Sequence, residues 1–216
     1  MQGLQKVPCQ NRMFRGVCDM KKYVHKIRDM VKNAVGNIGD GIFNKKIDAL
    51  NMIALNYLQF SPSQLWGDIM EVLECSRDYA RAMAASHCNM VSTWALIFVQ
   101  EKIEMSYAEF FKWCLESNYC DQYGYLKIGK GQLLKKLGID FEVEYYYDYN
   151  LLSNAKGLKD GFYQMRIQGH FIACYVHNNK VYLSDTASRG QGTLAEKVIK
   201  KSEFLWLLDF NLIEVA

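Results

Sequence analysis

One stretch near the C-terminal end, "HFIACYVHNNKVYLSDTA" (170–187), restricts the possible folds more than any other part of this sequence. Two runs rich in β-branched and aromatic residues flank Asn178-Asn179, and asparagine accepts the positive φ angles that a two-residue hairpin turn requires. The stretch therefore predicts two antiparallel strands, with His177 opposite Lys180. Any fold proposed for the chain must contain this hairpin.

The predicted register decides which side chains of the hairpin share a face. Side chains alternate along a strand and cross-strand partners share a face, so His170 and Asp185 are expected on the same side of the sheet. They are diagonal neighbours, about 7 to 8 Å apart at the backbone, and an imidazole and a carboxylate can close that gap. A turn longer or shorter by one residue would put them on opposite faces.

The rest of the chain predicts helices first and strands afterwards. This order is typical of the α+β class with a mostly antiparallel sheet. Capping and turn signals place the ends of several elements, including an N-cap at Ser61, a capping box at Ser106 and Glu109, and a closing Gly138. The expected helices are 20–37, 45–60, 61–85, 86–101, 106–117, 130–138 and 202–208, and the expected strands are 139–148, 161–168, the hairpin and 211–216.

The helix expected at 86–101, "SHCNMVSTWALIFVQE", differs from the others because apolar residues surround it almost completely. A helix without a polar face belongs in the interior of a protein. Ser86 is the expected N-cap, which puts Cys88 in the first turn of this helix. There the unpaired backbone N–H groups and the positive end of the helix dipole favour a thiolate.

Composition excludes several classes of protein. A formal net charge of +3 and a pI near 8.4, without a block of basic residues, do not suit nucleic-acid binding. No apolar run approaches the length of a membrane span and no signal peptide opens the sequence, so the chain is expected in the cytoplasm, without a membrane partner. The seven cysteines are irregularly spaced and predict reduced thiols, with no metal site and no cofactor.

A histidine held by a carboxylate is a general base, and Cys88 is the best candidate for the nucleophile that it would activate. Together Cys88, His170 and Asp185 have the chemistry of a nucleophile, a base and the residue that orients the base. The backbone N–H groups at the start of the helix could in addition stabilise an oxyanion during acyl transfer. The sequence therefore predicts amide hydrolysis through a thioester.

These residues and their order resemble the papain-like cysteine peptidases. A cysteine opens a central buried helix, "GHF" begins an apolar strand about eighty residues later, and "VYLSDTA" follows in the next strand. The likeness covers residues 86–216 and is greatest to the short bacterial branch that includes the double-glycine leader peptidases. It implies Cys88 as nucleophile, His170 as general base and then acid, and Asp185 as the residue that orients the imidazole. It also implies a helix that carries the cysteine and packs on the sheet.

Two positions depart from the pattern of that family. The cysteine is followed by Asn89 where the family usually has glycine, and Ala82 stands where it has the glutamine of the oxyanion hole. Losing one oxyanion donor typically costs about a hundred- to thousand-fold in rate. Gln10, Asn89 or another group could replace that donor. Residues 1–85 have no counterpart in the minimal family domain, and we interpret them as a helical extension that covers the cleft or binds a partner.

Several alternatives stay open on the sequence alone. Cys18, with Gln10 ahead of it, is a rival nucleophile, although the charged segment after it does not suit a central helix. His87 is adjacent to Cys88 but points elsewhere on a helix, and we expect it at the surface or as a cap. The substrate is a peptide or a peptidoglycan-type amide, and a cell-wall endopeptidase is the second enzyme candidate. From another class, a catalytically silent papain-like domain would act as a binding or structural module.

Overall fold

The computed structural model describes residues 40–139, 145–146, 160–167, 170–177, 180–187 and 206–209. The helix expected at 20–37 lies outside these residues, as do Gln10, Cys18 and the strand expected at 211–216. Of the strand expected at 139–148, the structure describes Tyr145–Tyr146 as a strand.

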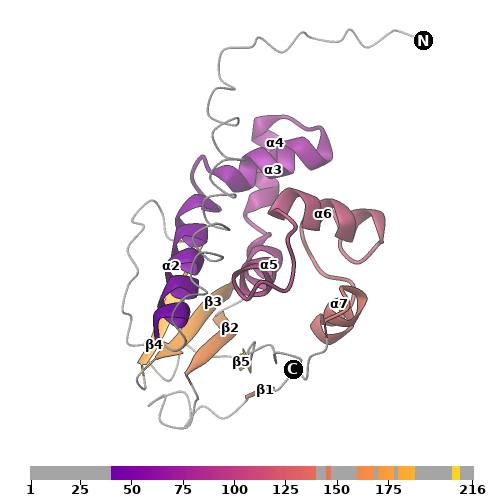
Figure 1. Ribbon diagram of the computed structural model, residues 1–216. Coiled ribbons are helices and arrows are strands. Elements are labelled where there is room, and N and C mark those ends of the chain that lie inside the picture. Colours follow the sequence, from indigo (N-terminus) through magenta and orange to yellow (C-terminus); the bar gives the residue numbers. More distant parts are fainter. Residues whose placement is uncertain are drawn as a thin grey trace, which may run out of the picture.

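Helices precede a small sheet along the described chain, which confirms the α+β class (Figure 1). Every strand pairing described is antiparallel, as expected. The helices are α2 (Asp40–Asn56), α3 (Gln64–Leu73), α4 (Arg77–Ala84), α5 (Cys88–Val99), α6 (Tyr107–Glu116) and α7 (Lys130–Lys136). The strands are β1 (Tyr145–Tyr146), β2 (Gly161–Ile167), β3 (His170–His177), β4 (Lys180–Ser184) and β5 (Trp206–Asp209).

The hairpin of β3 and β4 forms in the predicted register. His177 lies opposite Lys180 and Cys174 opposite Leu183. The prediction was correct because a two-residue turn fixes the pairing locally, without help from the rest of the fold.

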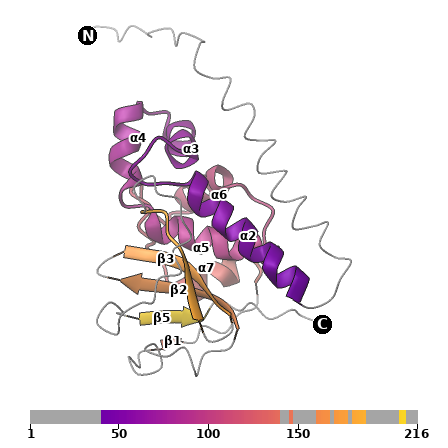
Figure 2. The same cartoon turned by 90° about the vertical axis from the view of Figure 1, so that its left-hand side faces the viewer.

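The helix expected at 202–208 is wrong where the structure describes this segment. Residues 206–209 form β5, which pairs with β1 on one side and with β2 on the other (Figure 2), in the strand order β1-β5-β2-β3-β4. A short apolar run such as "LWLL" suits a buried strand as well as a buried helix. Pairing with distant strands decides between them here, and a local pattern does not show that pairing.

The long helix expected at 61–85 is also wrong, because the chain breaks into α3 and α4. The N-cap of α3 is Ser63 rather than Ser61, and Glu74, at a φ of 49°, ends the helix. Ser76 then caps α4, where its hydroxyl accepts a hydrogen bond from the backbone N–H of Tyr79. Serine competes for backbone hydrogen bonds and favours a cap over a helix interior, which explains the break.

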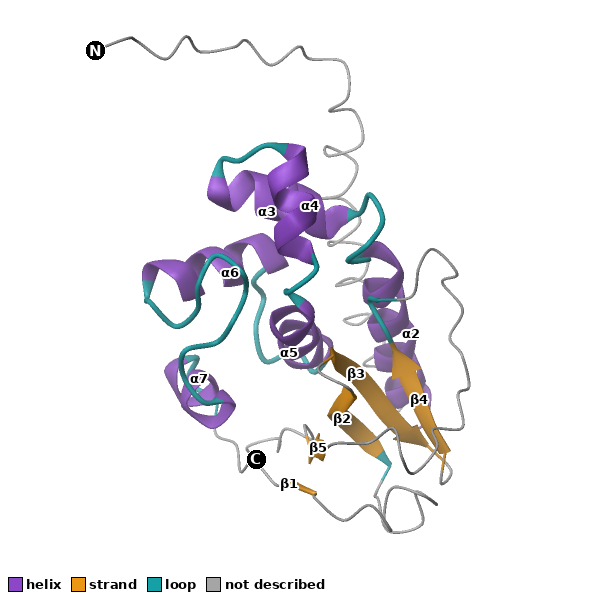
Figure 3. Cartoon of the chain, turned by 180° about the vertical axis from the view of Figure 1, so that it is seen from behind, coloured by secondary structure: helices purple, strands orange, loops and turns teal. Residues whose placement is uncertain are grey.

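Helix α5 is buried and occupies the centre of the fold, as its sequence predicted. Apart from Asn89, each of its residues is buried. It contacts β2 and β3, while α2 runs alongside and contacts β4. Helices α3, α4 and α6 lie on the far side of α5 from the sheet (Figure 3). The first residue of α5 therefore lies where the helical layer meets the sheet.

One continuous hydrophobic core joins these layers. It includes Ile53 of α2, Leu65 of α3, Trp94 of α5, Phe110 of α6 and Ala173 of β3. Residues before and after position 85 thus share a core, and the division into a helical extension (1–85) and a papain-like domain (86–216) stays a prediction.

Two hydrogen bonds also attach α2 and the segment that follows it to the end of β4. The Ser184 hydroxyl donates to Oδ1 of Asn51 on α2 over 2.7 Å. The backbone N–H of Gln59 donates to the carbonyl oxygen of Thr186 over 2.9 Å. Asp185 lies between these two anchored residues, so the chain before residue 60 helps to position it.

Within the part of the chain that the structure describes, no single helix is long and apolar enough to cross a membrane. The pair α4 and α5 reaches the length and composition of a span only when taken together across a bend of 79°.

Candidate active site

Cys88 is the first residue of α5, and the sharp turn from α4 presents it. The expectation that Ser86 caps this helix is wrong, since the N-cap position is occupied by His87. The hydroxyl of Ser86 instead donates to the carbonyl oxygens of Met83 and Tyr123, which ties the turn to a neighbouring loop. Cys88 nevertheless lies in the first turn, where backbone N–H groups have no partner within the helix.

Polar groups inside the core fix the start of α5 against the sheet. Gln164 of β2 is fully buried, and its Nε2 donates to the hydroxyls of Ser92 over 2.7 Å and Thr93 over 3.1 Å. Those hydroxyls in turn donate to the carbonyl oxygens of Cys88 and Asn89, over 2.6 and 2.7 Å. The side-chain oxygen of Gln164 is buried without a hydrogen-bond partner among the described residues, so the bonds that Nε2 donates are the ones that fix the helix against the strand.

The sequence analysis did not identify this network, although its signal was present. A glutamine inside the apolar strand "GFYQMRI" and a Ser-Thr pair inside the apolar helix are exceptions to the local pattern. Buried polar side chains need hydrogen-bond partners, so these exceptions could have been matched to one another.

His170 and Asp185 are joined as the register predicted. Nε2 of His170 donates to Oδ1 of Asp185 over 2.7 Å, and these side chains are 24% and 31% exposed. The same oxygen accepts the backbone N–H of Ala187 over 2.8 Å, which fixes the carboxylate in a turn. The ring is thus held through Nε2, and its second nitrogen, Nδ1, is not used in the bond with Asp185.

The Cys88 thiol completes this arrangement by hydrogen bonding to the His170 imidazole. The backbone N–H groups of Phe171 and Asn89 also point at the sulfur. The structure therefore brings together the three residues that the sequence singled out, from the start of α5, the start of β3 and the end of β4.

Electrostatics in this cluster favour a charged sulfur and a charged ring. Burial raises the pKa of the Cys88 thiol, but the hydrogen bonds from His170 and Phe171 outweigh burial and lower the pKa below its ordinary value. Burial lowers the pKa of His170, but the bonds to Asp185 and Cys88 outweigh burial and raise the pKa to about 9. Because a thiolate is the reactive form of cysteine, Cys88 can act as a nucleophile.

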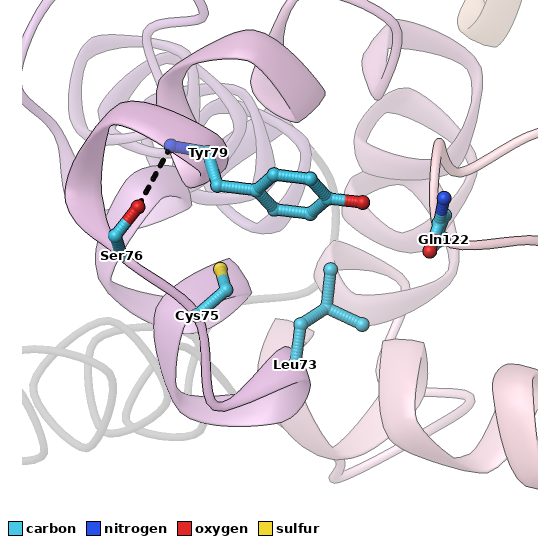
Figure 4. Close-up of a pocket in the computed structure, with 5 residues that line it drawn as sticks. All are labelled: Leu73, Cys75, Ser76, Tyr79 and Gln122. Atoms are coloured by element: carbon cyan, nitrogen blue, oxygen red, sulfur yellow. Dashed lines mark hydrogen bonds between the residues drawn. The ribbon is translucent and has the colours of Figure 1, made fainter. Parts of the chain in front are cut away.

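Other described cysteines lack these conditions. Burial raises the pKa of Cys75 and of Cys174, and the pKa of Cys114 is raised by its hydrogen bond with Cys120 and by burial. Cys75 lines a pocket of about 410 Å³ in which the Tyr79 hydroxyl points toward Gln122 (Figure 4). Neither His87 nor His170 is among the described residues that line this pocket.

His87 occupies the cap position that the sequence suggested, but its side chain is buried rather than at the surface. Nε2 donates to the carbonyl oxygen of Gln122 over 3.3 Å, and Nδ1 accepts from the Tyr107 hydroxyl over 2.5 Å. Burial lowers the pKa of His87 to about 4, so the ring is neutral near pH 7. Both ring nitrogens are used within the core, and His87 is not the base for Cys88.

A second pocket, of about 630 Å³, lies beside α4. Its lining consists of Gln59, Phe60, Asp78, Arg81, Ala82 and Ala85. The lining residue Gln59 bonds through its backbone to Thr186, next to Asp185. Ala82, which stands where the papain-like pattern has its oxyanion glutamine, lines this pocket.

Neither described glutamine near the site replaces that missing donor. Nε2 of Gln59 donates to the carbonyl oxygens of Ala84 and Ala85, both over 3.0 Å. Nε2 of Gln164 donates to the hydroxyls of Ser92 and Thr93 on α5. Gln10 lies outside the described residues. Backbone N–H groups of the first turn of α5 remain as donors next to the sulfur.

Comparison with known proteins adds no assignment: no family model, no curated protein and no solved structure matches the chain.

Proposed function

We propose that the chain is a papain-like cysteine hydrolase that cleaves an amide bond through a thioester intermediate. The observation that supports this most is the continuous series of contacts from the Cys88 thiol to the His170 imidazole and on to the Asp185 carboxylate. A nucleophile, a base and an orienting acid in contact are the requirements for covalent acyl transfer.

In the proposed reaction, the Cys88 thiolate attacks the carbonyl carbon of the amide and forms a tetrahedral oxyanion. This intermediate collapses when the C–N bond breaks, and the His170 imidazolium gives its proton to the leaving amine. His170 then takes a proton from water, whose oxygen attacks the thioester. The thiolate leaves and the carboxylic acid is released; His170 keeps the proton taken from water, so the thiolate and the imidazolium again form the ion pair. Asp185 holds the ring in position throughout.

The backbone N–H groups at the start of α5 are the proposed oxyanion donors. They lie in the first turn next to the sulfur, where the helix dipole favours negative charge. The pocket beside α4 is the proposed binding site for one side of the substrate, a peptide or a peptidoglycan-type amide. The reducing cytoplasm is the compartment in which a free thiolate of this kind persists.

A catalytically silent papain-like module is the second candidate. It is favoured by Ala82 in place of the family's glutamine and by the engagement of both nearby glutamine amides elsewhere. An activated thiolate distinguishes the two candidates, because a binding module does not need one.

Alkylation with iodoacetamide near pH 6 tests the proposal, with peptide mapping by mass spectrometry to assign the labelled residue. Cys88 is expected to react roughly ten times faster than Cys75, since its lowered pKa gives it a larger thiolate fraction at this pH than the raised pKa of Cys75 allows. His170→Ala should abolish this advantage. His87→Ala is not a matched control because His87 packs in the core, so Cys75→Ser serves to show that the fast site is Cys88.

Slow and uniform labelling of all cysteines would contradict the enzyme and favour the silent module. Fast labelling of Cys88 that persists in His170→Ala would show a reactive thiol without the proposed partner.

A further inference from the structure

Two cations flank Phe171, the residue whose backbone N–H points at the Cys88 sulfur. The Lys130 Nζ lies 4.6 Å from the centre of the Phe171 ring, and the Cζ of Arg166 lies 5.6 Å from it. Arg166 is the direct cross-strand partner of Phe171 between β2 and β3, so the two side chains share a face of the sheet. Lys130 comes from the start of α7.

Both cations are partly removed from water. Lys130 is only 9% exposed, and burial lowers its pKa to about 7; the negative charge of Cys88 opposes this effect, and Arg166 adds to it. The Nε atom of Arg166 is buried and has no hydrogen-bond partner among the residues that the structure describes. A buried cationic donor without an acceptor is unfavourable, and it gains from an anion that enters the site.

We propose that Lys130 and Arg166 form a subsite for a carboxylate of the substrate, next to the amide bond that Cys88 attacks. This inference rests on the proposed function and names its substrate class, an amide that carries an acidic group beside the cleaved bond. A carboxylate between the two side chains would offset their mutual repulsion and accept a hydrogen bond from the guanidinium.

An alternative role for the same two residues is to stabilise the thiolate itself. In that case their removal would slow every reagent at Cys88 to the same extent. A carboxylate subsite instead changes the preference between an anionic and a neutral reagent. The ratio of two alkylation rates therefore separates the two roles.

The experiment compares iodoacetate with iodoacetamide at Cys88 near pH 6 in the full chain. Lys130→Met and Arg166→Gln are each expected to lower the iodoacetate to iodoacetamide rate ratio by about three- to tenfold, as expected for one close charge contact. Lys130→Arg, which keeps the charge, should keep the ratio. The matched control is Lys136→Met, an exposed lysine on the same helix, and it should also keep the ratio.

Each outcome decides the inference. A lowered ratio with a preserved iodoacetamide rate supports the subsite. An unchanged ratio in both variants, or equal slowing of both reagents, overturns the subsite while leaving the proposed hydrolase intact. Absence of selective iodoacetamide labelling at Cys88 overturns the hydrolase and the subsite together.

A second arm identifies the source of the carboxylate by protection of Cys88 against iodoacetamide. N-acetyl-glutamate amide offers a side-chain carboxylate, N-acetyl-alanine a terminal one, and N-acetyl-glutamine amide neither. At high millimolar concentration, one of the two acids should slow labelling more than the neutral amide does, and this difference should vanish in Arg166→Gln. Equal protection by all three compounds, or by none, overturns the subsite.

Discussion

His87 and His170 show that the surroundings of a histidine side chain determine its pKa and its role. His87 lies against Tyr107 and Phe111, with ring centroids 6.1 and 4.8 Å away, and burial lowers its pKa to about 4. His170 is also largely buried, but its interactions with the Asp185 carboxylate and the Cys88 side chain outweigh burial and raise its pKa to about 9. One imidazole is therefore a neutral part of the core, and the other is charged near pH 7.

Replacing the carboxylate by an amide in Asp185→Asn tests this account of His170. The negative charge and the hydrogen bond of Asp185 both raise the His170 pKa, so the variant should have a lower one. A smaller fraction of the His170 rings is then charged, so the ring stabilises the Cys88 thiolate less, and the pKa of the thiol should rise. Labelling of Cys88 by iodoacetamide should slow at pH 6, on the order of tenfold for each unit of that rise.

At pH 9 the rates of the variant and of the unmodified chain should converge, because an ordinary thiol also ionises there. The control is Asp48→Asn, which removes an exposed carboxylate from α2. An equal loss at both pH values would instead indicate that Asp185→Asn damages the fold.

The position of α5 depends on a loop that follows α6. Asp121 fixes this loop, since its Oδ1 accepts the backbone N–H groups of Tyr123 and Tyr125 over 2.9 and 3.0 Å. The loop brings Gly124, at a φ of +73°, against the His87 ring, where a Cβ would lie 2.9 Å from Cγ. The close approach therefore requires glycine, and it presses the loop onto the residue that precedes Cys88.

Gly124→Ala is expected to destabilise the fold more than Gly138→Ala. Both glycines have a left-handed backbone, with φ of +73° and +74°, and each substitution should cost about 1 to 2 kcal/mol for that reason. No atom of the described residues lies within 4 Å of a Cβ at Gly138, whereas the Cβ at Gly124 would displace the buried His87 ring. Urea denaturation of both variants measures the difference.

Labelling of Cys88 should also slow in Gly124→Ala but not in Gly138→Ala, since a moved His87 displaces the start of α5. Equal stability losses and equal labelling rates in the two variants would show that the contact with His87 has no effect.

Across the part of the chain that the structure describes, several features that depend on local sequence were predicted correctly. The hairpin register, the capping box of Ser106 and Glu109, and the left-handed Gly138 at the end of α7 each depend on a few neighbouring residues, and each is confirmed. The burial of α5 followed from its composition alone. Cys88, His170 and Asp185 were found in the same way, and the structure brings them into contact, while their catalytic roles stay a proposal.

What the sequence did not reveal depends on partners far apart in the chain. The segment of β5 becomes a strand because β1 and β2 pair with it. Lys130 and Arg166 carry no motif, and only folding brings them to the same aromatic ring. Such features follow from tertiary packing, which overrides local preference.

The stability of the whole protein should depend on pH through Asp68, a buried carboxyl of α3. Burial raises its pKa to about 7, while hydrogen bonds from Gln64 and from the Tyr57 hydroxyl oppose this. A carboxyl whose pKa rises on folding favours the folded state at low pH, and this contribution is lost as the pH rises through about 7. Asp68 should therefore destabilise the chain progressively between about pH 4 and pH 7.

Asp68→Asn removes this dependence. Relative to the unmodified chain, its free energy of unfolding should increase with pH over that window, by at most about 1.4 kcal/mol for each pH unit. Urea denaturation at several pH values measures the trend, and Asp48→Asn controls for the loss of one negative charge. A constant difference between the two chains across the window would contradict the effect of burial on Asp68.

The contacts of the Cys88 sulfur have a practical consequence. Backbone from α5 holds it on one side, while the ring of His170 and the N–H of Phe171, both in β3, hold it on the other. Cys88 is expected to react fast only while α5 stays packed against β3. The rate of its alkylation therefore reports whether the tertiary structure is intact. An investigator could follow melting, ligand capture or crowding by timing one covalent reaction, without attaching any dye.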